Sequence, residues 1–217
     1  MPIQKDCVPL YSDKCFIDMT TDNCMKQVHI ITPVKDSIDL TLETARAVLA
    51  SRWHVPVTYT IYNDFSTDEN TRRLEEASQE LGFELVNLRD ITSHPSPNYL
   101  LVLQMAQKRA IEAEAGLLIV ESDVIVRENT LQGLFDGALA HPDCGIAASV
   151  TVDEQGTVNY PYLYASDYPK EACEVKKHCS FCCSLLTLRL LKAIDFQTLD
   201  PSKNRFDVTI SHESHER

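Results

Sequence analysis

The feature that most constrains this chain is an alternation of two hydrophobic periods between residues 28 and 150. Short apolar or β-branched runs, typical of strands, occur at 28–32, 57–62, 84–88, 117–120 and 144–150. Helical patterns separate them, and such alternation with short connections predicts an open, mainly parallel sheet with helices on both faces. Ligands of sheets of this type bind beyond the carboxyl ends of the strands. Those ends are therefore where a functional site is expected.

The predicted helices cover 38–49, 66–81, 98–115, 130–140 and 190–194. In the first of them, Ile38, Leu42, Ala45 and Leu49 are spaced to share one buried face. The second opens at a capping box in which Ser66 and Asp68 are the expected caps, and Gly82 ends it. We expect the third to close at Gly116, and the first strand to stop at Pro33.

Composition excludes several classes of protein. The chain has 217 residues and a formal net charge of -12, which argues against non-specific binding to nucleic acid or to an anionic membrane. No apolar run approaches the roughly 18 residues that span a bilayer. The first residues lack the pattern of a signal peptide, which predicts a cytoplasmic protein, either free or attached peripherally to a membrane.

An acidic segment follows the fourth apolar run. Glu121 and Asp123 come directly after Leu117–Val120, and two carboxylates spaced i, i+2 at a strand end lie on one side of the chain. Such a pair is costly to hold together unless a cation lies between the groups or one is protonated. Oxygen ligands suit Mg²⁺ or Mn²⁺, which complete their shells from substrate phosphates. This pattern favours a metal-bridged nucleotide site.

Asp64 follows the second strand and precedes a helix. A carboxylate at this position can accept a hydrogen bond from the imide N–H of a uracil or thymine ring. Because Ser66 and Asp68 suffice to cap the helix, Asp64 is the better functional candidate.

Two further groups of residues have weaker signals. Among the eight cysteines, the spacing Cys179-x-x-Cys182 lacks a second pair of zinc ligands, so we interpret the cysteines as structural thiols, with Cys182 and Cys183 buried. The tyrosines at 160–168 either stack on an acceptor sugar or cover the core.

Several segments together resemble one known family. Asn63–Thr71 resembles the "DDgSxDxT" signature of family 2 glycosyltransferases of the GT-A fold, and Ile31–Val34 is similar to their opening strand. Glu121–Asp123 falls where those enzymes have a metal-binding DxD motif. Phe206–His212 is similar to the segment that contains their catalytic base. The resemblance covers residues 28–217, with residues 1–27 as an N-terminal extension.

The resemblance implies an α/β fold, a GT-A-like three-layer α/β/α sandwich with a mostly parallel central sheet. It also implies a metal-dependent enzyme that moves a sugar from a nucleoside-diphosphate donor, UDP by family preference, to a hydroxyl of a glycan or lipid-linked acceptor, with inversion. Polysaccharide biosynthesis is the expected setting.

Carried over position by position, the resemblance implies four nucleotide-binding residues, namely Thr32, Pro33, Asp64 and Glu121. Asp123 would bind the Mn²⁺ or Mg²⁺ that bridges the two phosphates. Asp207 would take the proton from the acceptor hydroxyl, and one in-line displacement would then invert the anomeric carbon.

This chain departs from the family pattern at several positions. Asn63 and Glu121 stand where the family has Asp, and residues 98–115 lack the Ala-Arg-Asn-x-Gly signature, so no site residue is assigned there. Ten residues follow Asp207, which predicts short acceptor elements. Two alternatives remain: a non-catalytic nucleotide-sugar-binding module, and a nucleotidyltransferase of similar fold. The second is disfavoured because Thr32–Ser37 contains no glycine for a phosphate loop.

Overall fold

A computed structural model of the chain describes residues 5–8, 25–153, 155–158, 174–175 and 178–216. The tyrosines at 160–168 lie outside the described residues, so their predicted role is not addressed. The same is true of Cys15, Cys24 and Cys173.

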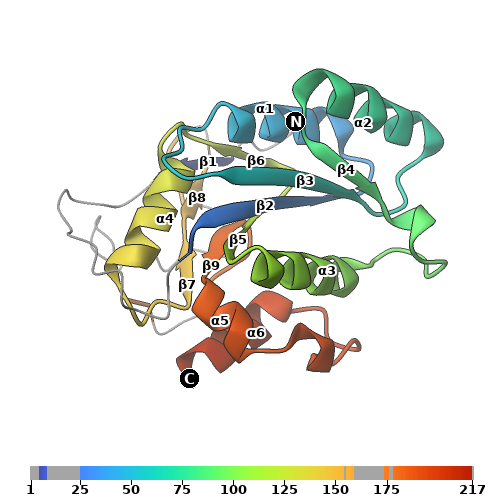
Figure 1. Cartoon of the computed structure of the whole chain (residues 1–217). Coiled ribbons are helices and arrows are strands. Elements are labelled where there is room, and N and C mark those ends of the chain that lie inside the picture. Colours follow the sequence, from blue (N-terminus) through green and yellow to red (C-terminus); the bar gives the residue numbers. More distant parts are fainter. Residues whose placement is uncertain (1–4, 9–24, 154, 159–173, 176–177, 217) are drawn as a thin grey trace.

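A six-stranded sheet forms the centre of the molecule (Figure 1). Its strands, in spatial order, are β4 (Glu84–Asn87), β3 (Val57–Asn63), β2 (Gln27–Val34), β5 (Ala115–Val120), β9 (Cys183–Leu186) and β7 (Ile146–Ala148). The first four are parallel to one another, and β9 is antiparallel to both of its neighbours. The prediction of a mostly parallel sheet is confirmed.

Helices cover both faces of this sheet (Figure 1). On one face lie α1 (Ile38–Leu49), α2 (Asp68–Leu81) and α4 (Thr130–Ala140). On the other lie α3 (Tyr99–Glu112), α5 (Leu188–Ala193) and α6 (Phe206–His215), with short 3-10 turns at η1 (Leu88–Asp90) and η3 (Phe196–Thr198). The result is the predicted three-layer sandwich. Within the described residues, no helix combines the length and apolar character needed to cross a membrane.

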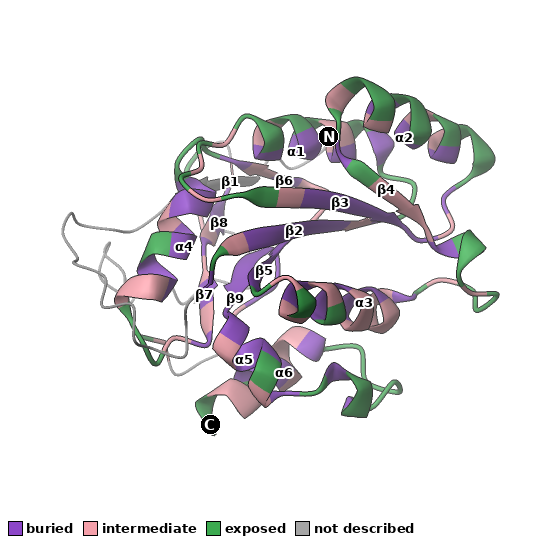
Figure 2. Cartoon of the chain, viewed as in Figure 1, coloured by how far each residue is buried: buried purple, intermediate pink, exposed green. Residues whose placement is uncertain are grey.

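The strands have continuous apolar runs because both faces of the sheet are buried. Successive residues alternate between two hydrophobic clusters: Ile30 and Leu118 pack under α1, α2 and α4, whereas Ile31 and Leu117 pack under α3, α5 and α6. Figure 2 shows the central strands mostly buried, β4 at the edge of the sheet partly exposed, and the outer helix faces exposed. This packing fixes where the strand ends emerge at the edge of the sheet.

A second, three-stranded sheet has the order β6 (Val124–Val126), β1 (Lys5–Val8), β8 (Val150–Val152). We predicted no strand at residues 5–8, yet β1 pairs parallel with β6 and antiparallel with β8. Because β6 begins directly after Asp123, this sheet holds the chain where it leaves the acidic segment. The predicted single strand at 144–150 is wrong, since β7 and β8 lie in different sheets.

Three predicted details of the elements are wrong. β2 continues through Pro33. Val34 O points toward β3 and accepts from Asp64 N (2.8 Å), so the backbone of Pro33 faces the other neighbour, β5. The pairing of β2 with β5 ends at Ile31, so the N–H that proline lacks has no partner to lose there. Leu49 is 42% exposed, and Val48 takes its place in the core. The third helix ends at Glu112, where Glu114 turns the chain with φ 50°, and Gly116 belongs to β5.

Candidate active site

The loops that follow β2 and β3 are tied together by Asp36. Its backbone N–H donates to Ser66 Oγ (2.9 Å), and its carboxylate accepts from Thr67 N (2.7 Å) and Asn70 Nδ2 (3.1 Å). These hydrogen bonds, that of Thr67 first, hold the pKa of Asp36 below its ordinary value. Asp36 has φ 60°, in the left-handed region where a non-glycine residue is strained. The cross-link fixes the relative positions of the two strand ends.

The cap of α2 differs from the prediction. Thr67 is the N-cap residue, and its hydroxyl accepts from Asn70 N (3.3 Å). The prediction of Ser66 and Asp68 as the caps is wrong, because Ser66 Oγ accepts from Asp36 N and Asp68 is already the first helical residue. Gly82 ends the helix with φ 81°, as predicted.

Asn63 braces the same region from beneath. Its amide donates to Thr71 Oγ1 (2.9 Å) and Asn87 Oδ1 (2.8 Å), and its Oδ1 accepts from Ser66 N (3.2 Å). A carboxylate at this position could not donate to these two groups, whose own hydrogens are directed to Ser66 O and Glu75 Oε1. Much of the signature segment therefore has a structural role in this chain.

The structure buries most of the predicted nucleobase pocket. Thr32 is fully buried, and its hydroxyl is hydrogen-bonded to Tyr59 OH (2.9 Å). Pro33 is half-buried beside it. Asp64 is 9% exposed, and three hydrogen bonds from Ser96 and Asn98 meet its carboxylate.

The acidic segment forms a turn. β5 ends at Val120, and Val124 N donates to Glu121 O (3.2 Å), so Glu121 and Asp123 sit in a turn to which strand alternation does not apply. Glu121 N donates to Cys182 O (2.9 Å), which anchors the turn to the chain just before β9. Both carboxylates are half-buried. The turn thus lies at the carboxyl end of β5, where the sequence placed it.

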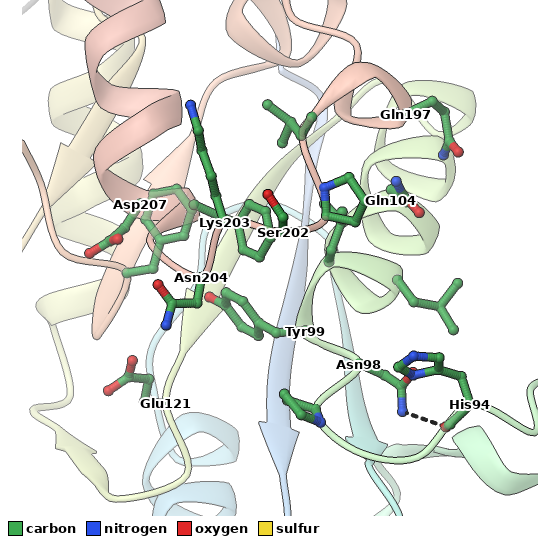
Figure 3. A pocket seen from close by; sticks show the side chains of 17 residues that line it. His94, Asn98, Tyr99, Gln104, Glu121, Gln197, Ser202, Lys203, Asn204 and Asp207 are labelled. Atoms are coloured by element: carbon green, nitrogen blue, oxygen red, sulfur yellow. Dashed lines mark hydrogen bonds between the residues drawn. The ribbon is translucent and has the colours of Figure 1, made fainter.

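A cavity of about 770 Å³ opens beside this turn (Figure 3). Its walls are the first turns of α3, Glu121, Phe181 and the segment 197–207. Glu121 and Asp207, which lie 86 positions apart in the sequence, are therefore brought to one cavity. The other predicted site residues are not among those that line it, namely Thr32, Pro33, Asp64 and Asp123.

Tyr99 lies between the ends of this cavity. Burial, and then the nearby carboxylates of Glu121 and Asp207, raise the pKa of its phenol well above the ordinary value. Its ring packs on Phe206, with centroids 6.4 Å apart. The phenol therefore remains protonated and can donate a hydrogen bond at neutral pH.

The far wall of the cavity is fixed to α3 by two glutamines. Buried Gln107 donates to the carbonyls of Leu191 (2.8 Å) and Ile194, and its Oε1 accepts from Phe196 N (3.0 Å). Gln104 Nε2 donates to Phe196 O (3.0 Å). These contacts place the 197–207 segment, and Asp207 at the start of α6, opposite the turn that follows β5.

Of the residues that line this cavity, the sequence analysis identified Glu121 and Asp207 alone, and those that it missed include Asn98, Tyr99 and Lys203. Asn98 precedes a helix that begins at the carboxyl edge of the sheet, and this position could have indicated it. Lys203 lies in an irregular loop without any recognisable signal. No site residue had been assigned to this helix, because it lacks the family signature.

The donors of the acidic turn suit a divalent ion in part. Among the residues that the structure describes, no three His, Cys, Asp or Glu side chains are grouped to hold a metal by themselves. Glu121 and Asp123 offer only carboxylate oxygens, the ligands that Mg²⁺ and Mn²⁺ prefer, and these ions commonly take further oxygens from substrate phosphates. The donor chemistry therefore fits Mn²⁺ or Mg²⁺ bound together with a diphosphate.

Comparison of the sequence with family profiles and with curated proteins gives no match. Solved structures are similar. The mannosyltransferase PcManGT from Pyrobaculum calidifontis, in complex with GDP-Man and Mn²⁺, superposes with a TM-score of 0.55 at 16% identity, over 90% of this chain and 54% of that one. TarS 1–349 from S. aureus in complex with UDP gives 0.58 at 17% identity, over 88% and 55%.

This chain thus spans about half the length of the structures it matches. Identities this low show the fold, and the chain has the GT-A-like α/β fold predicted from its sequence.

Proposed function

We propose that this chain is a metal-dependent glycosyltransferase that moves a sugar from a nucleoside-diphosphate donor to an acceptor hydroxyl with inversion. The observation that carries the proposal is the cavity lined by both Glu121 and Asp207 at the carboxyl edge of the sheet. Ligands of open α/β sheets bind at this edge.

The structural neighbours support the class of donor. PcManGT was solved with GDP-Man and Mn²⁺, and TarS with UDP. We take UDP as the nucleotide for this chain, on the resemblance of its sequence to family 2 glycosyltransferases. A glycan or a lipid-linked glycan is the proposed acceptor.

A cationic side chain of the cavity suits a diphosphate. Lys203 lines the cavity and carries a positive charge. Asp123 would hold Mn²⁺ or Mg²⁺, and the bound ion would supply positive charge that stabilises a departing diphosphate. Glu121 would contact the ribose or the donor sugar.

Asp207 is the proposed base. It lies in the first turn of α6, half-buried, and its Oδ1 accepts from Val208 N (2.8 Å), which fixes the carboxylate and leaves Oδ2 for the acceptor hydroxyl. A base in this position removes the proton as the hydroxyl attacks, since an alcohol is a poor nucleophile. Tyr99, protonated and close to both carboxylates, can donate to one of them or to a sugar hydroxyl.

The test is release of UDP from UDP-sugars, and of GDP from GDP-mannose, with Mn²⁺ present. Asp207→Asn keeps the size of the side chain, and we expect turnover to fall by roughly 10²- to 10⁴-fold, the contribution of a positioned base. UDP affinity should be unchanged. The matched control is Asp195→Asn, because Asp195 is exposed and caps η3 outside the cavity.

Three outcomes separate the possibilities. Loss of turnover in Asp207→Asn alone supports the proposal. Binding of UDP without turnover by any variant, the wild type included, identifies a non-catalytic nucleotide-binding module. If no nucleoside diphosphate binds, the proposed function is wrong.

A further inference from the structure

The carboxylate of Asp64 is occupied by hydrogen bonds from the chain itself. Its Oδ2 accepts from Ser96 Oγ (2.7 Å) and from Asn98 N (2.8 Å), and its Oδ1 accepts from Asn98 Nδ2 (2.7 Å). Asp64 is 9% exposed and is not among the residues that line the cavity, whereas Asn98 is. Asp64 is therefore connected to the cavity by its hydrogen bonds with Asn98.

The two ends of the Asn98 amide are distinguished by their partners. Nδ2 donates to Asp64 Oδ1 (2.7 Å) and to His94 O (3.1 Å). Both partners are oxygens without a hydrogen, so the reverse orientation would place the amide oxygen against two acceptors. Both amide hydrogens are used, and Oδ1 is the remaining polar atom of the side chain.

That oxygen has no partner within the described part of the chain. An asparagine at a helix N-cap usually accepts a hydrogen bond from the first turn, but Asn98 makes no such bond to α3. The residue is 7% exposed and lines the cavity, so what it offers a ligand there is a fixed hydrogen-bond acceptor.

The position of Asn98 agrees with a nucleobase site. Figure 3 shows Asn98 and His94 at one end of the labelled side chains, and Glu121 and Asp207 at the other, with Tyr99 between them. On the proposed function the second end holds the sugar and the diphosphate. The base of the same nucleotide then extends toward Asn98.

We propose that Asn98, and not Asp64, contacts the nucleobase, and that its Oδ1 accepts the hydrogen bond of a ring N–H. Uracil N3–H and guanine N1–H are such donors, whereas cytosine N3 and adenine N1 are acceptors that would face the oxygen unfavourably. Asp64 is a positioning residue that holds the amide in this orientation. The inference rests on the proposed function and names the residue that sets its nucleotide specificity.

The experiment is calorimetric titration of UDP and N3-methyl-UDP, with Mn²⁺, into the full chain. The methyl group removes the donor and leaves the diphosphate unchanged, so the ratio of the two affinities isolates the base contact. For the wild type we expect the methyl analogue to bind about tenfold more weakly, the upper range for one neutral hydrogen bond. GDP should bind measurably, and CDP and ADP more weakly than UDP.

Substitutions test which residue is responsible for the preference for UDP over N3-methyl-UDP. In Asn98→Ala the backbone N–H still donates to Asp64, and the ratio should fall to about one- to twofold. The matched control is Gln79→Ala, which removes an exposed amide of α2 outside the cavity and should keep the wild-type ratio. In Asp64→Asn the ratio should also fall, because the orientation of Asn98 is no longer fixed. A purely structural Asp64 would lower the unfolding temperature without changing the ratio.

The outcomes separate this inference from the proposed function. If UDP binds and Asn98→Ala keeps the wild-type preference over N3-methyl-UDP, the contact belongs to another residue and the inference is wrong while the function stands. If the wild type itself does not distinguish the two ligands, no ring N–H is recognised, and the inference is again wrong. If UDP does not bind at all, the proposed function fails first.

Discussion

Gln107 offers the sharpest test of how the cavity is assembled. Its buried amide makes three hydrogen bonds to the backbone of residues 191–196, and no other side chain in the described structure makes as many to that segment. Gln107→Met keeps the volume and removes all three. At about 1 kcal/mol net for each bond, the loss of stability is about 3 kcal/mol, and the buried Phe196 N–H left unpaired makes this a lower estimate.

The assay is thermal and urea unfolding of the full chain. A loss of about 3 kcal/mol corresponds to a drop of roughly 6–12 °C for a domain of this size. Gln104→Met is the matched control, because Gln104 makes one such bond and should lose about 1 kcal/mol. Equal losses in the two variants would refute the reasoning, since the three-bond network would then contribute no more than one bond.

Three further predictions concern other parts of the chain. Burial, and then the charge of Arg109, lowers the pKa of His29 from 6.5 to about 4, so the unfolded state binds a proton before the folded state does. This contribution to the free energy of unfolding is complete above pH 6.5 and falls by about 3 kcal/mol as the pH drops to 4. Urea unfolding measured at several pH values should show a smaller decrease of stability over this range in His29→Gln. Thr67→Ala should cost about 1 kcal/mol through loss of the α2 cap, and Thr67→Ser should restore most of it. In Gly116→Ala the new Cβ would lie 2.7 Å from Met25 Sδ and 2.9 Å from Leu185 Cδ1, so a loss of about 1–2 kcal/mol is expected in the same unfolding assay. If Gly116→Ala left the stability unchanged, the ends of the Met25 and Leu185 side chains would have to move aside without cost.

The sheet could be predicted from the sequence because its information is local. Runs such as Leu117–Val120 are buried on both faces of the sheet, and strands buried in this way consist of consecutive apolar residues. The small sheet could not be predicted in the same way. β1 has four residues and is paired on both sides by distant strands, so nothing in its own sequence identifies its partners.

The candidate site likewise has a part that local sequence predicts and a part that depends on contacts between distant segments. The acidic turn after β5 was recognisable, because two carboxylates after an apolar strand have few structural explanations. The meeting of Glu121 with Asp207 depends on Gln107 and on the packing of α6, contacts that join segments far apart in the chain. Asp64 was recognised as important, but its saturation by Ser96 and Asn98 is a tertiary fact that no motif contains.

The central claim is that the acidic turn and its cavity take a nucleoside diphosphate together with a divalent cation. Calorimetric titration of UDP into the full chain, with and without Mn²⁺, addresses it most directly. We expect binding that Mn²⁺ strengthens at least tenfold in the wild type, and that Mn²⁺ no longer changes in Asp123→Ala. Equal affinities with and without the ion, or an Asp123→Ala variant that responds to Mn²⁺ as the wild type does, would contradict the claim.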